Sequence, residues 1–151
     1  MLPVLKRSQF KINLKRKNNM SMLDQIVLIN AECFTSDDPY SHLDYLKTLK
    51  RNHNIGFITV KVCNKIVGYI IYKIYENHIE SLRRALTKNS RGQGLGLKLS
   101  KRLIRIAKIH KKDIYTYVSK TNLPSLNSNF KVGYRVTDIS DDWVYIRYVV
   151  K

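Results

Sequence analysis

The sequence predicts an α+β domain in which helices flank a mixed, mostly antiparallel sheet. Segments with apolar residues at every third or fourth position alternate with segments rich in β-branched and aromatic residues, as expected when helices cover a sheet. Three of the strand-like segments follow one another with short turns between them, which favours antiparallel pairing. The predicted order of elements is β-α-α-β-β-β-α-β-α-β-β.

The first half of the chain is predicted to hold one strand, two helices and three consecutive strands. Apolar and polar side chains alternate over Phe10–Leu14, and this period of two indicates a strand. A helix is expected over Met22–Phe34, where Asp24 lies in the first turn and interacts favourably with the helix dipole. Ser41 is the expected N-cap of a second helix, which is expected to end near Asn52 to Asn54. The next strands are predicted at Gly56–Val62, Ile66–Tyr75 and Ile79–Leu86.

The second half of the chain alternates helices and strands. A glycine-rich turn, Arg91–Gly96, leads into a long helix from Leu95 to Lys111. A short helix over Pro124–Val132 ends at Gly133, because glycine favours the left-handed backbone that terminates helices. The long helix is expected to pack on the sheet through Leu95, Leu99, Leu103 and Ile106. The remaining strands are predicted at Ile114–Val118, Arg135–Asp138 and Trp143–Val150.

Length and composition restrict the class of protein. The 151 residues suit one domain, predicted over residues 10–151 after a basic leader at residues 1–9, and a hydrophobic fraction of 44% excludes a disordered tail. Cys33 and Cys63 are too few for a disulfide scaffold and lack the spacing of a metal site. No apolar run is long enough for a signal peptide or a membrane helix. We therefore expect a cytoplasmic protein without a metal ion.

The formal net charge is +17, from 28 Lys and Arg against 11 Asp and Glu. Such a charge favours anionic partners, which include nucleic acids and phosphate-bearing ligands. No acidic residue occurs before Asp24 or between Ser81 and Lys112, where basic residues concentrate. A basic stripe is predicted on the long helix from the spacing of Lys101, Arg105, Lys108 and Lys112. A solvated helix face is the alternative interpretation of this stripe.

The glycine-rich turn, Arg91-Gly-Gln-Gly-Leu-Gly-Leu97, is suited to bind a pyrophosphate. Glycines let a ligand approach the backbone, and the first N–H groups of the following helix have no acceptor within the helix. A tight turn without a ligand is the alternative. A P-loop is excluded because no Lys-Ser or Lys-Thr follows at the required spacing. A Rossmann turn is excluded because Gly92, Gly94 and Gly96 are two residues apart and the preceding strand is the third of a hairpin series.

The turn resembles the pyrophosphate signature of the GNAT superfamily of acyl-CoA N-acetyltransferases, Arg/Gln-x-x-Gly-x-Gly/Ala, at Arg91, Gly94 and Gly96. A second motif of that superfamily is Asn-x-x-Ala/Ser followed by a short helix and Gly-Phe/Tyr. It is matched by Asn122, Ser125, Gly133 and Tyr134. The resemblance runs from about residue 10 to the C-terminus. It implies a GNAT-like fold in which a splayed pair of parallel strands holds acetyl-CoA.

The resemblance also implies which residues hold acetyl-CoA as co-substrate. The splayed strands would be Ile79–Leu86 and Ile114–Val118. Backbone groups of the first strand would bind the pantetheine and polarise the thioester carbonyl, and N–H groups of the turn would bind the pyrophosphate. The residues expected to bind the cofactor are Arg84, Ala85, Leu86, Arg91, Gly92, Gln93, Gly94, Leu95, Gly96, Leu97, Asn122, Ser125 and Asn129.

Acetylation of an amine requires a general base, because an aliphatic ammonium has a pKa of about 10 and only the neutral amine attacks. Glu80 lies eleven residues before Arg91 on the central strand. By resemblance, this is the position of the catalytic Glu in the histone-acetyltransferase branch of the superfamily. A surface Glu paired with a nearby Lys or Arg is the alternative interpretation.

The sequence departs from the superfamily at the acid that protonates the leaving thiolate. The Tyr expected seven residues after Asn122 is replaced by Asn129, and an amide cannot donate a titrating proton. Either the thiolate leaves unassisted or through water, or a displaced hydroxyl serves as the acid. Tyr117 and Tyr115 are the candidate hydroxyls, although alternating tyrosines on a strand are also typical of packing. A degenerate enzyme that only binds acyl-CoA is a further interpretation.

Two functions follow from these observations. The first is an N-acetyltransferase that moves an acetyl group directly from acetyl-CoA to an amine, carried by an anionic macromolecule such as a ribosome, tRNA, DNA or one of their proteins. The second is a nucleic-acid-binding or regulatory module on a GNAT scaffold. A small polyamine acceptor fits the net charge poorly unless Asp37, Asp38 and Asp44 form an acidic pocket. Neither function involves a membrane, and the chain is expected to be a monomer or a homodimer.

Overall fold

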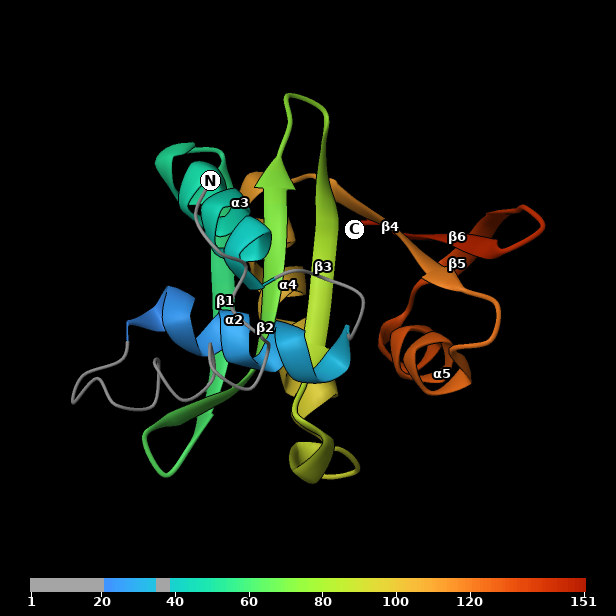
Figure 1. Cartoon of the computed structure of the whole chain (residues 1–151). Coiled ribbons are helices and arrows are strands. Elements are labelled where there is room, and N and C mark those ends of the chain that lie inside the picture. Colours follow the sequence, from blue (N-terminus) through green and yellow to red (C-terminus); the bar gives the residue numbers. More distant parts are fainter. Residues whose placement is uncertain (1–20, 35–38) are drawn as a thin grey trace.

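The structure is a computed structural model that describes residues 21–34 and 39–151 (Figure 1). The predicted leader at residues 1–9, the predicted strand Phe10–Leu14 and the acidic residues Asp37 and Asp38 lie outside the described residues. Asp44, the third member of the suggested acidic pocket, is exposed. From the first helix onward, helices and strands follow one another in the order that the sequence predicts.

Six strands of the described chain form one sheet. Their spatial order is β1 (Ile55–Val62), β2 (Lys65–Ile74), β3 (His78–Leu86), β4 (Asp113–Ser119), β6 (Trp143–Tyr148) and β5 (Arg135–Ile139). Neighbouring strands are antiparallel except β3 and β4, which run parallel. The predicted α+β fold with a mixed, mostly antiparallel sheet is therefore confirmed.

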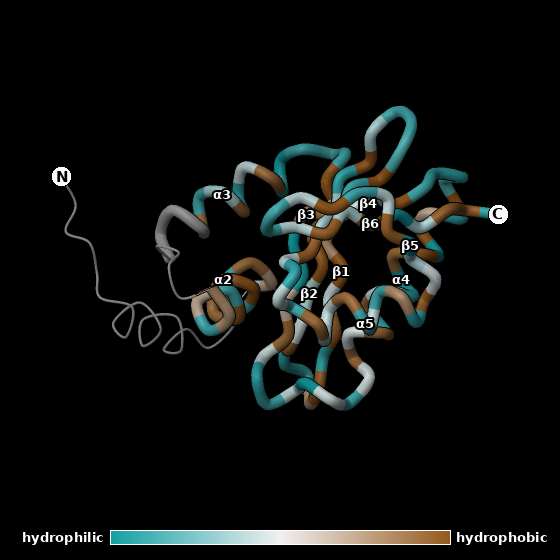
Figure 2. Tube along the Cα trace, turned by 90° about the vertical axis from the view of Figure 1, so that its right-hand side faces the viewer, coloured by the Kyte–Doolittle hydropathy of each residue, from teal (hydrophilic) through white to brown (hydrophobic). Residues whose placement is uncertain are grey.

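Two pairs of helices cover opposite faces of the sheet (Figure 2). On one face α2 (Met22–Cys33) and α3 (Pro39–Arg51) pack against β1, β2 and β3. On the other face α4 (Leu95–His110) and α5 (Leu123–Val132) enclose a second apolar core. Between β3 and α4 the chain makes one short 3-10 turn, Lys88–Ser90. No helix in the described residues is long and apolar enough to span a membrane.

The helices begin and end close to the predicted residues. The side chain of Ser21 accepts the N–H of Asp24 at 3.2 Å and so caps α2. Helix α3 begins at Pro39, two residues before the expected N-cap Ser41. The last strand, β6, ends at Tyr148, two residues before the predicted end.

Helix α4 packs through the apolar face that the sequence predicts. Leu99 and Leu103 are buried, and the partly buried Leu95 and Ile106 pack against the same core. The helix ends at His110 because the next residue, Lys111, adopts a left-handed backbone with φ of 53°.

The end of α4 corrects the predicted basic stripe. Lys112 lies beyond the helix, and its ammonium donates to the backbone oxygen of Tyr75 at 2.7 Å. Lys101, Arg105 and Lys108 are exposed on the helix. The stripe is therefore shorter than the spacing predicts.

Ile79 tests the packing of the central strand. Its side chain is 0% exposed, whereas Ile109 on α4 is 78% exposed. We expect Ile79→Ala to lower the free energy of unfolding by about 2–5 kcal/mol, because it leaves a cavity in the core. The control Ile109→Ala should change it by less than about 0.5 kcal/mol. Urea unfolding followed by circular dichroism measures both values, and equal losses would contradict the packing.

Candidate active site

The two parallel strands separate after a short paired stretch. Pairing joins His78–Glu80 of β3 to Asp113–Tyr115 of β4 and then stops. On its other edge β3 carries a bulge at Leu82, since consecutive residues of β2 pair with Ser81 and Arg83. A bulge bends its strand and increases the local twist. Beyond the paired stretch, β3 and β4 therefore form a fork.

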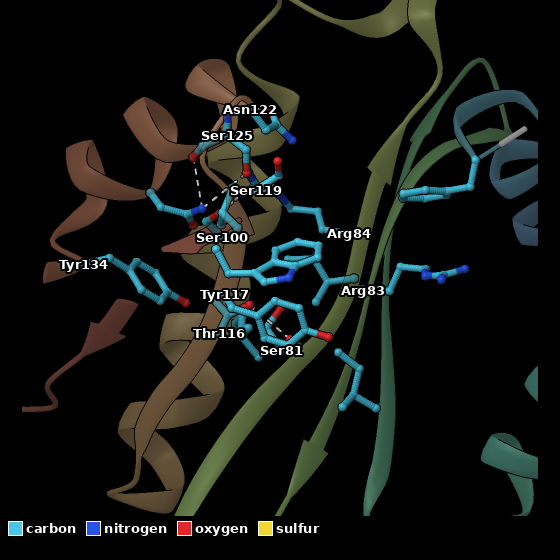
Figure 3. Close-up of a pocket in the computed structure, with 17 residues that line it drawn as sticks. Ser81, Arg83, Arg84, Ser100, Thr116, Tyr117, Ser119, Asn122, Ser125 and Tyr134 are labelled. Carbon is cyan, nitrogen blue, oxygen red and sulfur yellow. Dashed lines mark hydrogen bonds between the residues drawn. The ribbon is translucent and has the colours of Figure 1, made fainter. Parts of the chain in front are cut away.

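A cavity of about 330 Å³, here called the fork cavity, lies in this fork (Figure 3). Where the strands part, Oγ1 of Thr116 donates to the backbone oxygen of Ser81 at 3.1 Å. From the helices, Ser100 of α4 and Ser125 of α5 face the cavity. Among the described residues that line it there is no Asp or Glu.

Arg84 reaches from β3 into the fork cavity toward the helices. Its Nη1 donates to the hydroxyl of Ser100 at 2.7 Å, and its Nη2 donates to those of Ser125 and Ser128 at 2.9 and 3.2 Å. Burial lowers the pKa of the guanidinium, but an arginine remains protonated in proteins. The cavity therefore holds a positive charge.

Helix α5 supplies two amides to the fork cavity, and both already have partners. Oδ1 of Asn122 accepts the N–H of Ser125 at 3.3 Å and caps the helix. Asn129 is buried, and its Nδ2 donates to the backbone oxygen of Ser125 at 2.9 Å. Just after α5, Tyr134 is buried and turns its hydroxyl toward the cavity (Figure 3).

The glycine-rich turn follows β3 and begins α4. Gly92 and Gly94 have φ of 77° and 78°, and a Cβ at either position would meet no atom within 4 Å. Gly94 is the N-cap of α4, so the N–H groups of Leu95–Leu97 have no acceptor within the helix. The exposed turn thus combines open space, free N–H groups and the positive end of a helix dipole, the features that bind a phosphate.

The side chains beside the turn contact the protein. Nη2 of Arg91 donates to the backbone oxygen of Leu86 at 3.3 Å and to Sγ of Cys33 at 3.5 Å. Burial raises the pKa of the Cys33 thiol, and the opposing effect of Arg91 is smaller. Gln93 donates to the backbone oxygen of Asn89 at 3.3 Å.

Beyond Glu80, the edge of β3 that faces β4 has no paired strand in the described chain. The side chain of Ala85 is buried in the core beneath α2, and Leu86 packs against the core beneath α4. Neither residue lines the fork cavity with its side chain.

A second cavity of about 490 Å³, here called the Glu80 cavity, adjoins the first. Thr116 and Tyr117 of β4 line both cavities. Glu80 forms no ion pair within the described residues, so the alternative of a surface Glu paired with Lys or Arg is not observed there. Burial and the proximity of Glu80 raise the pKa of Tyr75, which places the two side chains next to each other.

Aromatic side chains gather at the Glu80 cavity. The ring of Tyr117 meets that of Trp143 edge to face at 5.1 Å and lies 6.0 Å from that of Tyr145. The ring of His78 meets that of Tyr115 edge to face at 5.2 Å. Such walls bind the apolar part of a substrate, while the carboxylate of Glu80 can accept a proton.

Comparison with known proteins identifies the family. A model of the Acetyltransferase (GNAT) family matches residues 23–134. The chain belongs to this family. It is therefore an acetyl-CoA-dependent acetyltransferase, with the co-substrate that is typical of the family.

Solved structures share the fold of this acetyltransferase. The ribosomal-protein-S18-alanine N-acetyltransferase of Escherichia coli has a TM-score of 0.71 at 13% identity, over 89% of this chain and 92% of that one. PH1933 of Pyrococcus horikoshii has a TM-score of 0.76 at 18% identity, over 90% and 95%. The N-acetyltransferase PseH of Campylobacter jejuni, in complex with acetyl coenzyme A, has a TM-score of 0.68 at 20% identity, over 84% and 92%. A search of curated proteins by sequence found no significant match.

In the acetyltransferase, the predicted site residues fall into three places. The fork cavity collects Arg84, Tyr117, Asn122, Ser125 and Asn129. The turn carries residues 91–97 at the far end of β3, and Glu80 lies in the adjoining cavity. The prediction missed Ser100, Ser128 and Trp143, and it named Tyr134 as part of the second motif without giving it a role in the site. For Ser100, the local signal was a serine within the apolar face of the long helix.

Gly94 tests whether the turn binds the donor. Alanine in a left-handed conformation costs roughly 1–2 kcal/mol, so the turn should relax unless the ligand forces it back. We expect Gly94→Ala to raise the Kd for acetyl-CoA about tenfold, as measured by titration calorimetry. Gly133→Ala, at φ of 112° after α5, is the control for backbone strain away from the turn. An unchanged Kd in Gly94→Ala would refute the assignment.

Proposed function

We propose that the acetyltransferase transfers the acetyl group directly from acetyl-CoA to an amine, with Glu80 as the general base. One observation carries this proposal: the fork cavity and the Glu80 cavity share Thr116 and Tyr117. A donor held in the first cavity and an amine held in the second would meet at β4. Direct transfer then needs no nucleophile of the protein.

The residues of the fork fit acetyl-CoA, which supplies an activated acyl group when bound. The N–H groups of Gly92–Leu97 would bind the pyrophosphate, where open space and the helix dipole favour an anion. The backbone of Arg84–Leu86 would bind the pantetheine. These assignments place the thioester near Ser81 and Thr116, where the strands part.

The Glu80 cavity supports binding and deprotonation of an amine. The carboxylate of Glu80 would take the proton of the ammonium, directly or through water. The exposed rings of Tyr115 and Tyr145 can contact a cation before it loses its proton. Tyr117, at the junction of both cavities, would position the amine against the thioester.

We place the acceptor amine on an anionic macromolecule such as a ribosome, a tRNA, DNA or one of their proteins. Lys101, Arg105 and Lys108 are exposed on α4, and the chain carries a net charge of +17. The Escherichia coli enzyme with this fold is named for an alanine of a ribosomal protein. A cytoplasmic location suits the free thiols of Cys33 and Cys63.

Glu80→Gln tests the general base. We expect kcat/KM for a primary amine to fall about 10²–10⁴-fold, since the amide cannot accept a proton. The Kd for acetyl-CoA should not change, because Glu80 does not line the fork cavity. Thiol release measures the rate, and Glu76→Gln, which replaces an exposed carboxylate in the turn before β3, is the control. Activity within a factor of a few of the wild type would rule out this base.

The basic residues of α4 are tested by replacing Lys101, Arg105 and Lys108 with Gln together. We expect kcat/KM for ribosomes or aminoacyl-tRNA to fall and to depend less steeply on salt, with a log–log slope smaller by up to about 3. Activity toward a small primary amine is the internal control and should not change. The acceptor proposal fails if the triple variant keeps the full salt dependence. No turnover with any amine, together with salt-sensitive RNA binding, would favour a regulatory module instead.

A further inference from the structure

Two polar side chains in the fork cavity have unused hydrogen-bonding capacity. A guanidinium has five N–H donors, and Arg84 uses three on serine hydroxyls, so two lack a partner among the described residues. Tyr134 is 3% exposed, and its hydroxyl has no hydrogen-bond partner in the described part of the chain. That hydroxyl points into the cavity (Figure 3). Arg84 is half-buried and Tyr134 is buried. Because a buried polar group normally has a partner, the phenol beside this guanidinium indicates a binding site.

Among the described residues, no acidic side chain lies around this pair to neutralise the positive charge. Apart from Arg84 and Tyr134, the charged or titratable groups facing the cavity or the Tyr134 ring are Arg83 of β3, Tyr117 of β4 and Tyr148 of β6. The guanidinium of Arg83 donates to Asn30 and lies over the ring of Phe34, on the α2 side of the sheet. Helices α4 and α5 contribute only neutral side chains. A half-buried cation without a counter-charge favours a negatively charged ligand.

Arg84 and Tyr134 act on the same region of the cavity. Burial raises the pKa of the Tyr134 phenol, and the nearby charge of Arg84 opposes this effect. The phenol therefore stays neutral at working pH and offers a hydrogen bond. The guanidinium offers a charge and two free N–H donors.

We propose that Arg84 and Tyr134 form the site that receives the leaving thiolate of coenzyme A. This inference rests on the transferase function proposed above. In the transfer, the amine nitrogen bonds to the thioester carbonyl carbon, the carbon–sulfur bond breaks, and its electron pair stays on sulfur. Glu80 takes one proton from the ammonium before the attack and releases it to solvent, and it then takes the second proton that the nitrogen loses after the attack. Arg84 and Tyr134 keep their protons, so coenzyme A leaves as the thiolate and takes a proton from solvent.

The site accounts for the Asn at the position where the resemblance expects a tyrosine acid. Arg84 and Asn129 both donate to the hydroxyl of Ser125, at 2.9 and 3.5 Å. The guanidinium therefore lies beside the residue that replaces the acid, and the shorter Asn leaves space for it. A fixed positive charge stabilises a thiolate without transferring a proton.

Binding of coenzyme A tests this site without any acceptor. We expect the thiol of bound coenzyme A to have a pKa about one unit or more below that of the free thiol. A pH titration of the complex, followed by the ultraviolet absorbance of the thiolate, measures this shift. The Kd for coenzyme A should then fall about tenfold as the pH rises between the two pKa values. The Kd for desulfo-coenzyme A, which lacks the sulfur, should not fall as the pH rises.

Substitutions test which residues lower the pKa of the bound thiol. Tyr134→Phe and Arg84→Met should each bring the pKa of the bound thiol back toward that of free coenzyme A. Arg83→Met, on the same strand, and Tyr148→Phe, next to the Tyr134 ring, should leave the shift unchanged. Tyr134→Phe keeps the packing of the ring, so it decides the question even if Arg84→Met fails to fold.

Three results would overturn the inference: an unshifted thiol in the wild type, a shift that survives both substitutions, or a shift that only Tyr117→Phe abolishes. If Arg84→Met instead weakens the binding of succinyl-CoA and leaves the thiol unaffected, Arg84 binds an acyl carboxylate and the inference is wrong.

The titration of the bound thiol tests the thiolate site separately from the assignment of Glu80 as the base. If Glu80→Gln is fully active and the thiol is shifted, the base assignment fails and the thiolate site stands. If Glu80→Gln is inactive and the thiol is not shifted, the thiolate site fails and the base stands. Absence of coenzyme A binding would overturn both.

Discussion

The separation of β3 from β4 is the constraint on which the site depends. Parallel strands that remain paired hydrogen-bond their backbones to each other and leave no space between them. Here the bulge at Leu82 bends β3, and the pairing ends at Glu80 and Tyr115. The backbone beyond that point needs other partners, and the side chains of α4 and α5 become accessible between the strands. One break in a ladder thus produces both the cavity and the exposed strand that would hold a ligand.

The elements that the sequence predicted correctly depend on local patterns. Apolar spacing placed α4, and glycines marked the turn because only they adopt the left-handed backbone of Gly92 and Gly94 without strain. The contacts of Arg84 could not be predicted in this way. Its serine partners lie 16 to 44 residues further along the chain, and in the sequence it is one basic residue among many. Lys112 shows the same limit, because its helical spacing gave no sign that the helix ends before it.

The basic residues divide by what surrounds them. Arg84 is half-buried among hydroxyls. Arg102 donates to the backbone oxygen of Thr59 at 2.6 Å, and Lys112 donates to that of Tyr75. These cations hold elements together or charge the cavity, and salt screens them little. Exposed cations on α4 act over about one Debye length, roughly 8 Å at physiological ionic strength. The net charge of +17 is therefore the sum of two contributions with different physical effects.

The bulge also decides which side chains share a cavity. In a regular strand, side chains four residues apart lie on the same face. Without the bulge, Glu80 and Arg84 would therefore lie on the same face of the sheet. Ile79 packs in the core beneath α4, whereas Ala85, six residues later, packs beneath α2. The extra residue at Leu82 therefore moves the later side chains of β3 to the opposite face of the sheet, as a shift of one residue in strand register does. A carboxylate next to Arg84 would neutralise its charge, and an arginine next to Glu80 would hold the carboxylate in an ion pair. The bulge that opens the fork thus also keeps Glu80 and Arg84 on opposite faces of the sheet.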